Sequence, residues 1–289
     1  MLYFYLITSA HFLAIQKCTL AVVIGLSKAA SSDELKNHDD IYMKTETTPK
    51  VILTAVLNAK KVCLSLFFGL VSIAATGQNI RYDTIQYAKE YYQKRVVVFN
   101  NEPVLKHRII FIGNSLTQFG DWNKLLDDST VVNRGIAGDN TYGVLARLND
   151  VIIRKPAKLF IEIGINDISQ NIPGQIVIKN IRLIVKQLHT KSPKTKVYIT
   201  SILPTNDRVK TEYPQAYHKN DQVELINREL IRHAASDDYT YINLNSKVKD
   251  KNGELDTQYA KADGIHLNQL GYSKWVGLIN KEIMRVPKK

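Results

Sequence analysis

The sequence predicts one α/β/α domain over residues 78–289, in which a five-stranded parallel sheet lies between layers of helices. Two observations lead to this fold class. From about residue 80 onward, short apolar runs rich in β-branched residues alternate with longer amphipathic segments, which is the pattern of strands covered by helices. Polar residues also gather just after the apolar runs, where parallel sheets carry their ligand sites. No repeat or low-complexity linker divides this stretch.

Five apolar runs are predicted to be strands, and the segments between them are predicted to be helices. The strands are Arg108–Ile112, Thr130–Asn133, Lys158–Ile163, Lys196–Ile202 and Tyr239–Leu244. A first helix is expected at Tyr82–Val98, before the first strand. Four later segments carry apolar residues at helical spacing, namely Thr141–Ile153, Ile176–Thr190, Asp221–Ala235 and Gln269–Met284.

Residues 1–77 are predicted to be an export segment. Lys60 and Lys61 precede an uncharged, mostly apolar run at residues 62–75, which ends in the small residues Ala75-Thr76-Gly77. This order is typical of a secretory signal peptide, and the run is too short to span a bilayer. The alternative is a buried core helix. The export reading predicts a periplasmic or extracellular protein with no stable membrane span in its mature form.

A second apolar stretch, at residues 2–26, leaves two explanations open. Either Met43 is the true start and residues 1–42 are an over-extended gene prediction, or the first segment is a membrane anchor. Cys18 and Cys63 both precede the expected cleavage point. The mature protein is therefore expected to contain no disulfide, no thiol nucleophile and no cysteine-bound metal.

The charge of the predicted domain is basic but dispersed. Residues 78–289 contain 32 Lys and Arg against 22 Asp and Glu, a net charge of +10 that is not gathered into blocks. Such an excess fits attraction to anionic glycans or surfaces, although a solvated basic exterior is its commoner meaning. No nucleic-acid-binding motif accompanies it, so a nucleic-acid partner is not expected.

Four polar clusters follow predicted strands and contain the residues that can do chemistry. They are Gly113-Asn114-Ser115-Leu116-Thr117, Gly135-Ile136-Ala137-Gly138-Asp139, Gly164-Ile165-Asn166-Asp167 and Asp263-Gly264-Ile265-His266. A serine hydroxyl attacks an ester only when a base takes its proton and a further acceptor holds that base in one tautomer. Ser115 is the predicted nucleophile, His266 the base and Asp263 the acceptor.

The same clusters offer donors for the oxyanion of an acyl-transfer reaction. They are the backbone N–H groups of Ser115 and Gly138 and the side-chain amide of Asn166. Each has a structural alternative, since Ser115 and Asn166 could cap helices and Gly138 could serve a turn. Their joint occurrence at successive strand ends favours catalysis.

In this order the clusters resemble the SGNH hydrolases, also called GDSL-like lipases and esterases. The family blocks Gly-Asp-Ser-Leu, Gly, Gly-x-Asn-Asp and Asp-x-x-His look like Gly113–Leu116, Gly138, Gly164–Asp167 and Asp263–His266. The resemblance covers roughly residues 107–285. It implies a flavodoxin-like five-stranded sheet and a Ser-His-Asp acyl-enzyme mechanism, and we expect no metal or organic cofactor. Asn114 stands where the family usually has Asp, which is expected to alter local hydrogen bonding without abolishing activity.

The resemblance also limits the range of expected substrates. Residues Asn133 to Leu148 are similar to bacterial thioesterase/lysophospholipase-type enzymes and to platelet-activating-factor acetylhydrolase catalytic subunits, and secreted carbohydrate acetylesterases share the same blocks. Together with the export signal, this favours an exported esterase acting on short acyl groups, most of all acetyl esters of carbohydrates. The alternatives are a lysophospholipase or thioesterase for longer acyl chains, and a non-catalytic glycan-binding domain with the same fold.

Overall fold

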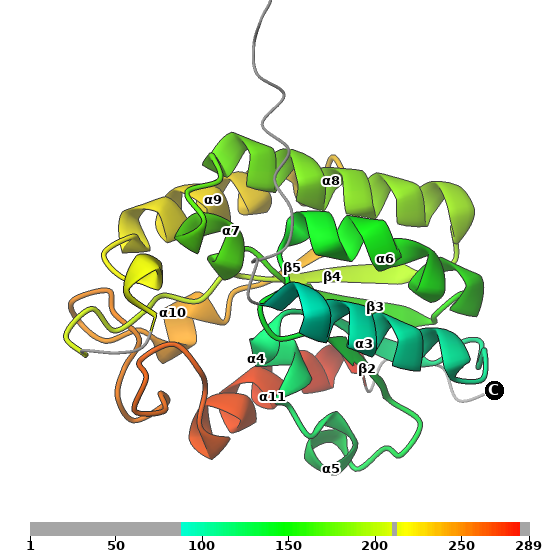
Figure 1. The fold of residues 1–289 in the computed structure, drawn as a ribbon, viewed down its shortest axis with the longest axis horizontal. Coiled ribbons are helices and arrows are strands. Elements are labelled where there is room, and N and C mark those ends of the chain that lie inside the picture. Colours follow the sequence, from blue (N-terminus) through cyan, green and yellow to red (C-terminus); the bar gives the residue numbers. More distant parts are fainter. Residues whose placement is uncertain (1–87, 210–212, 284–289) are drawn as a thin grey trace, which may run out of the picture. The chain divides into compact units, whose positions relative to one another are not determined.

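The computed structural model describes residues 88–209 and 213–283, and in them five parallel strands form one sheet. The strand order is β2-β1-β3-β4-β5. The strands are β1 (Ile109–Gly113), β2 (Val132–Gly135), β3 (Lys158–Glu162), β4 (Lys196–Thr200) and β5 (Thr240–Ile242). Helices cover both faces of the sheet (Figure 1). The predicted three-layer α/β/α class and its flavodoxin-like strand order are therefore confirmed.

The helices divide between the two faces (Figure 1). The longest helices on one face are α6 (Thr141–Arg154), α8 (Gly174–Lys191) and α9 (Asn220–His233). The other face carries α5 (Trp122–Leu126) and α11 (Gln269–Ile283). The remaining helices are α3 (Lys89–Asn101), α4 (Ser115–Gln118), α7 (Ile165–Ser169), α10 (Asn245–Val248) and a 3₁₀ turn at Pro214–Ala216. None of the helices within the described ranges has the length and apolar character that a membrane crossing requires.

Each face of the sheet carries its own apolar core, because the side chains of the buried strands point alternately to the two faces. In β1, Ile110 and Ile112 pack with the apolar faces of α6, α8 and α9, whereas Ile109 and Phe111 belong to the opposite core. Neighbouring rings stack across that opposite face, with Phe111 4.8 Å from Phe160 and 4.0 Å from Trp122 between ring centroids. Because successive side chains of a strand point to opposite faces, continuous apolar runs indicate a sheet covered on both sides.

The winding direction of the sheet reverses between β1 and β3. The chain runs from β1 outward to β2, then crosses to β3 on the other side of β1. Ligands of open α/β sheets bind outside the carboxyl ends of the strands at such a reversal. Ser115 directly follows β1, and Asn166 lies just beyond β3. The topology therefore brings these two predicted site residues to one crevice.

The element boundaries differ from the predicted ones by a few residues. The first two strands lie one and two residues later than predicted, at Ile109–Gly113 and Val132–Gly135. The helix expected at Tyr82–Val98 runs over Lys89–Asn101, and its first predicted turns fall before the described residues. The predictions for residues 1–77 also lie outside the described residues.

Candidate active site

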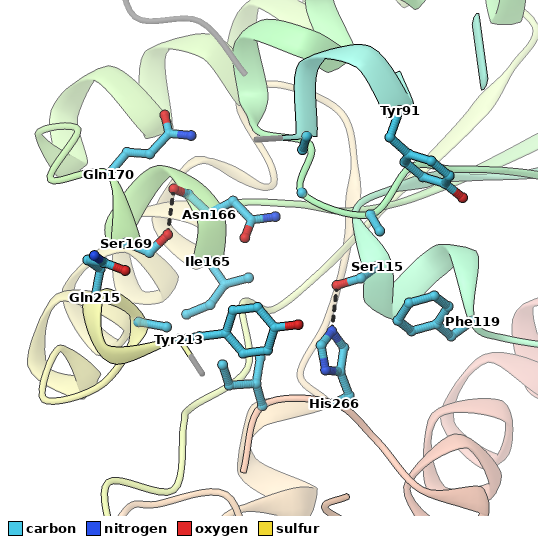
Figure 2. A pocket seen from close by; sticks show the side chains of 15 residues that line it. Tyr91, Ser115, Phe119, Ile165, Asn166, Ser169, Gln170, Tyr213, Gln215 and His266 are labelled. Carbon is cyan, nitrogen blue, oxygen red and sulfur yellow. Dashed lines mark hydrogen bonds between the residues drawn. The ribbon is translucent and has the colours of Figure 1, made fainter. Parts of the chain in front are cut away.

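Ser115, His266 and Asp263 form one chain of hydrogen bonds. His266 Nε2 lies 2.8 Å from Ser115 Oγ, and His266 Nδ1 lies 2.7 Å from Asp263 Oδ2. Figure 2 shows the Ser115 hydroxyl directed at the imidazole ring. The serine follows β1 and the other two residues follow β5 by about twenty residues, so the sheet edge joins groups 151 positions apart. In this arrangement the imidazole can accept the serine proton while the carboxylate holds its other nitrogen.

The carboxyl group of Asp263 is fixed by its own loop. Its Oδ1 accepts hydrogen bonds from the backbone N–H groups of Ile265 and His266, both at 2.9 Å, which leaves Oδ2 for the imidazole. Partial burial raises the pKa of Asp263, but the hydrogen bonds from His266 and Ile265 outweigh it and hold the pKa below its usual value. Tyr217 also donates its hydroxyl to the Asp263 carbonyl at 2.7 Å. The acceptor is therefore ionised and oriented before any substrate binds.

Asn114 and Gly113 set the position of Ser115, the predicted nucleophile. Asn114 Oδ1 accepts from Leu116 N–H at 2.8 Å and so caps α4, whose first residue is Ser115. A Cβ on Gly113 would stand 2.0 Å from the carbonyl oxygen of Glu162, so only glycine fits where β1 passes β3. Asn114, rather than Ser115, is thus the capping residue.

The predicted oxyanion donors surround the same cavity as Ser115. Gly138 has φ of +81°, a conformation that favours glycine, and it lines the cavity with Asn166. Asn166 Nδ2 donates to the carbonyl of Asp139 at 2.8 Å, and Figure 2 shows its amide on the Ser115 side of α7. The N-cap of α7 is Gly164, and no side chain caps this helix. Asn166 therefore does not serve as the helix cap that was its structural alternative.

A buried ion pair ties the β1 end to the loop after β2. Both Nε and Nη2 of Arg147 lie within 2.9 Å of Asp139 Oδ2, and the same guanidinium donates to the carbonyl of Gly113 at 3.1 Å. Burial raises the pKa of Asp139 to about 6, which still leaves it ionised at neutral pH opposite Arg147. Asp167 accepts the N–H and hydroxyl of Thr141, and burial raises its pKa to about 7. These carboxyl groups hold the site loops and do not contact His266.

Glu162 is a third buried acid of the site, next to the strand end that leads into Ser115. It ends β3, pairs in register with Gly113 and is 1% exposed. Neither of its carboxyl oxygens forms a hydrogen bond of standard geometry with the described residues, and neither does Asn114 Nδ2. Burial raises the pKa of Glu162 to about 8, and the nearby Asn114 amide offsets only part of this rise. Glu162 is therefore mostly protonated at neutral pH.

Comparison with known proteins agrees with this geometry. Residues 111–274, more than half of the chain, match the GDSL-like Lipase/Acylhydrolase family. The chain belongs to this family. It is an ester-hydrolysing enzyme with the α/β fold of the GDSL hydrolases.

Relatives of this GDSL-like enzyme include acetylhydrolases. The human platelet-activating factor acetylhydrolase IB subunit alpha1 is 25% identical over 186 residues, which are 62% of this chain and 76% of that protein. A GDSL-like lipase from Bacteroides thetaiotaomicron has a TM-score of 0.58 at 24% identity, covering 67% of this chain and 97% of the other. A catalytic mutant of the acetylxylan esterase Axe2 from Geobacillus stearothermophilus has a TM-score of 0.50 at 18% identity, covering 62% and 95%. The last two likenesses show the fold alone.

The cavity around Ser115 includes residues that the GDSL blocks do not contain. Its volume is about 860 Å³, and its wall includes Ala88, the N-cap of α3, and Tyr91 of α3, both of which lie before the family match. Gln118 connects two sides of the wall, because its Nε2 donates to the Tyr91 hydroxyl and its Oε1 accepts from Ala137 N–H, both at 2.7 Å. Sequence reasoning missed these residues, since their nearness to Ser115 depends on tertiary packing. The described part of the chain brings together no group of three His, Cys, Asp or Glu side chains that could hold a metal ion.

Proposed function

We propose that this GDSL-like hydrolase is a serine esterase that removes short acyl groups, acetyl above all, from carbohydrates. The observation that carries the proposal is the hydrogen-bonded chain from Ser115 through His266 to Asp263. His266 Nε2 takes the serine proton as Oγ bonds to the acyl carbon, and the alcohol then leaves with that proton as the ester C–O bond breaks. Water attacks the acyl-enzyme and gives its proton to His266, and Ser115 recovers a proton as the acid departs.

Oxyanion stabilisation is assigned to three groups of the same cavity. These are the backbone N–H groups of Ser115 and Gly138 and the Asn166 amide, whose hydrogen bond to Asp139 uses only one of its two N–H bonds. Fixed donors aimed at developing charge stabilise the transition state more than the ground state. The proposal involves no metal ion or organic cofactor.

The cavity wall supports a short acyl group and a polar alcohol. Beyond Ile165, the α7 side contributes the polar side chains of Asn166, Ser169 and Gln170, and Gln215 lies near them (Figure 2). A long alkyl chain bound against these side chains would remove them from water without replacing their hydrogen bonds. The acetyl specificity named for the human relative points in the same direction.

Ser115→Ala is the direct test of the nucleophile. The full-length protein is expected to react with a fluorophosphonate probe at Ser115 and to release acetate from acetylated xylosides faster than fatty acid from lysophospholipids. The variant should lose labelling and turnover while its melting temperature stays nearly unchanged, since only a hydroxyl is removed. Labelling that persists in the variant would contradict the mechanism, and faster fatty-acid release would favour the lysophospholipase alternative.

Asn166→Ala is expected to lower kcat by about 10²–10³ with little change in KM, as loss of one oxyanion donor does. The lost hydrogen bond to Asp139 should also reduce the free energy of unfolding by about 1 kcal/mol. Steady-state kinetics at a temperature where both proteins are folded separates these effects. If kcat is retained there, Asn166 has only a structural role.

We propose that residues 1–77 direct export of the protein. They contain, in the order typical of a signal peptide, a basic flank, an apolar run and small residues. Cleavage would release a chain that begins near Gln78, before α3. N-terminal sequencing of the protein recovered from the producing cell tests this assignment. Finding residues 1–60 intact on the mature protein would overturn it.

A further inference from the structure

The exposed Phe and Tyr side chains of the described residues gather at one cavity. Three aromatic residues there are more than a third exposed, Tyr91 (39%), Phe119 (45%) and Tyr213 (36%), and each lines the cavity that contains Ser115. Single exposed apolar residues are common on protein surfaces, but a gathering of them around a pocket marks a binding surface. These rings are therefore candidates for substrate contact.

Two of the rings flank the proposed base. The Phe119 ring lies 5.3 Å from the His266 ring, and the Tyr213 ring lies 6.4 Å from it, between centroids. Figure 2 shows Phe119 and Tyr213 on opposite sides of His266. Phe119 ends α4, one helical turn after Ser115, and Tyr213 directly precedes the 3₁₀ turn at Pro214–Ala216.

The role of His266 decides which part of the substrate these rings meet. The imidazole must return a proton to the oxygen of the leaving alcohol, so that oxygen has to lie within hydrogen-bond reach of Nε2. The carbonyl oxygen of the ester must instead point toward the oxyanion donors, which include Asn166 on α7. The alcohol portion therefore extends past His266, where Phe119 and Tyr213 are the exposed rings.

The chemistry around the rings favours an alcohol that is part of a sugar. An aromatic face packs well against a flat apolar surface, and the C–H face of a pyranose provides one while its hydroxyl groups remain available to polar neighbours. Such neighbours are present, since Lys261 Nζ lies 5.3 Å from the centre of the Phe119 ring and Gln215 lines the cavity near Tyr213.

We propose that Phe119 and Tyr213 form a leaving-group subsite that holds the sugar ring of an acetylated saccharide beside His266. The subsite rests on the proposed function, because it uses the assignment of His266 as the acid that protonates the alcohol. It adds two specificity-determining residues that lie outside the four family blocks.

Two acetyl esters with different alcohols test the subsite in the full-length enzyme. Acetylated methyl xyloside presents a ring to the subsite, whereas ethyl acetate does not, and both give the same acetyl-enzyme. Phe119→Leu and Tyr213→Leu should each lower the ratio of kcat/KM for the xyloside ester over ethyl acetate by about tenfold, as expected for loss of one ring-stacking contact. Leu270→Ala, at a residue 59% exposed on α11 and outside the cavity, is the control and should leave the ratio unchanged.

The possible results distinguish failure of the subsite from failure of the proposed function. If the wild-type enzyme turns over both esters and neither variant changes the ratio, the subsite is wrong and the esterase assignment stands. Hydrolysis of ethyl acetate without hydrolysis of the xyloside ester would also overturn the subsite. If the folded wild-type enzyme hydrolyses neither ester, the proposed function fails and the subsite fails with it.

Discussion

Asp263→Asn is expected to lower kcat by about 10⁴ with the fold intact, because the change leaves His266 in the wrong tautomer. The structure indicates how the new amide would be oriented. Two backbone N–H groups, those of Ile265 and His266, point at the position of Oδ1 and require an acceptor there. The amide nitrogen would then face His266 Nδ1 and donate to it. The proton of the neutral imidazole would move to Nε2, which could no longer accept the proton of Ser115.

Steady-state kinetics and thermal melting of the Asp263→Asn enzyme measure this effect. Asp256→Asn is a suitable control, since Asp256 also accepts a backbone N–H from its own loop, at Gln258, but has no contact with His266. That control should keep kcat within about twofold of wild type. A loss below tenfold for Asp263→Asn would mean that another group orients His266. Asp139 and Asp167 are not available for this role, because they bind Arg147 and Thr141.

Glu162→Gln is expected to stabilise the protein at alkaline pH. The folded-state pKa of Glu162 is raised to about 8 from the ordinary 4.5, so the folded protein holds a proton that the unfolded chain releases. The free energy of unfolding should therefore fall as pH rises from about 4.5 to 8 and should be level above that. Glutamine has the same shape, stays neutral and removes this decline. Near pH 8 the gain is at most about 5 kcal/mol, from 1.36 kcal/mol for each pKa unit.

Denaturant unfolding of both proteins at pH 5 and pH 8 tests this prediction. The difference between them should be small at pH 5 and large at pH 8, while the contributions of Asp139 and Asp167 cancel because both proteins contain them. Glu90→Gln is the matched control, since Glu90 is an exposed residue of α3 whose pKa is lowered by Lys94. It should show no stabilisation at pH 8. An equal gain from Glu162→Gln at both pH values would mean that Glu162 is ionised throughout.

Much of the fold follows from periodicity. The helices at Thr141–Arg154 and Gln269–Ile283 begin at the predicted residues, and their apolar residues pack in the two cores on either side of the sheet, as their helical spacing predicts. The short helices α4, α5, α7 and α10 have four or five residues each and hold too few turns for such a stripe. The predicted second strand ended at Asn133, two residues before the end of β2, because Arg134 interrupts the apolar pattern.

Arg134 shows why the local sequence pattern did not predict the end of β2. Its side chain is 2% exposed, pairs with Asp150 and Glu102, and lies over the Phe99 ring at 4.6 Å, so a buried charged residue stands within this strand. These partners come from other elements and leave no trace in the local sequence. Some residues of the candidate site could likewise be predicted from local sequence, and others could not. Ser115, Asp263 and His266 could be predicted from the strand-end clusters, whereas the nearness of Tyr91, Tyr213 and Glu162 depends on long-range packing.

The stacked aromatic core gives the protein an internal fluorescence reporter. The chain contains two tryptophans, Trp122 on α5 and Trp275 on α11, and their rings lie edge to face at 4.9 Å in one core. Both are buried on the face of the sheet opposite α6, α8 and α9. Their emission therefore reports the packing of the helix layer that contains α5 and α11. Far-ultraviolet circular dichroism instead reports the helices of both layers. Coincident unfolding curves from the two signals would show that the layers on either side of the sheet melt as one cooperative unit.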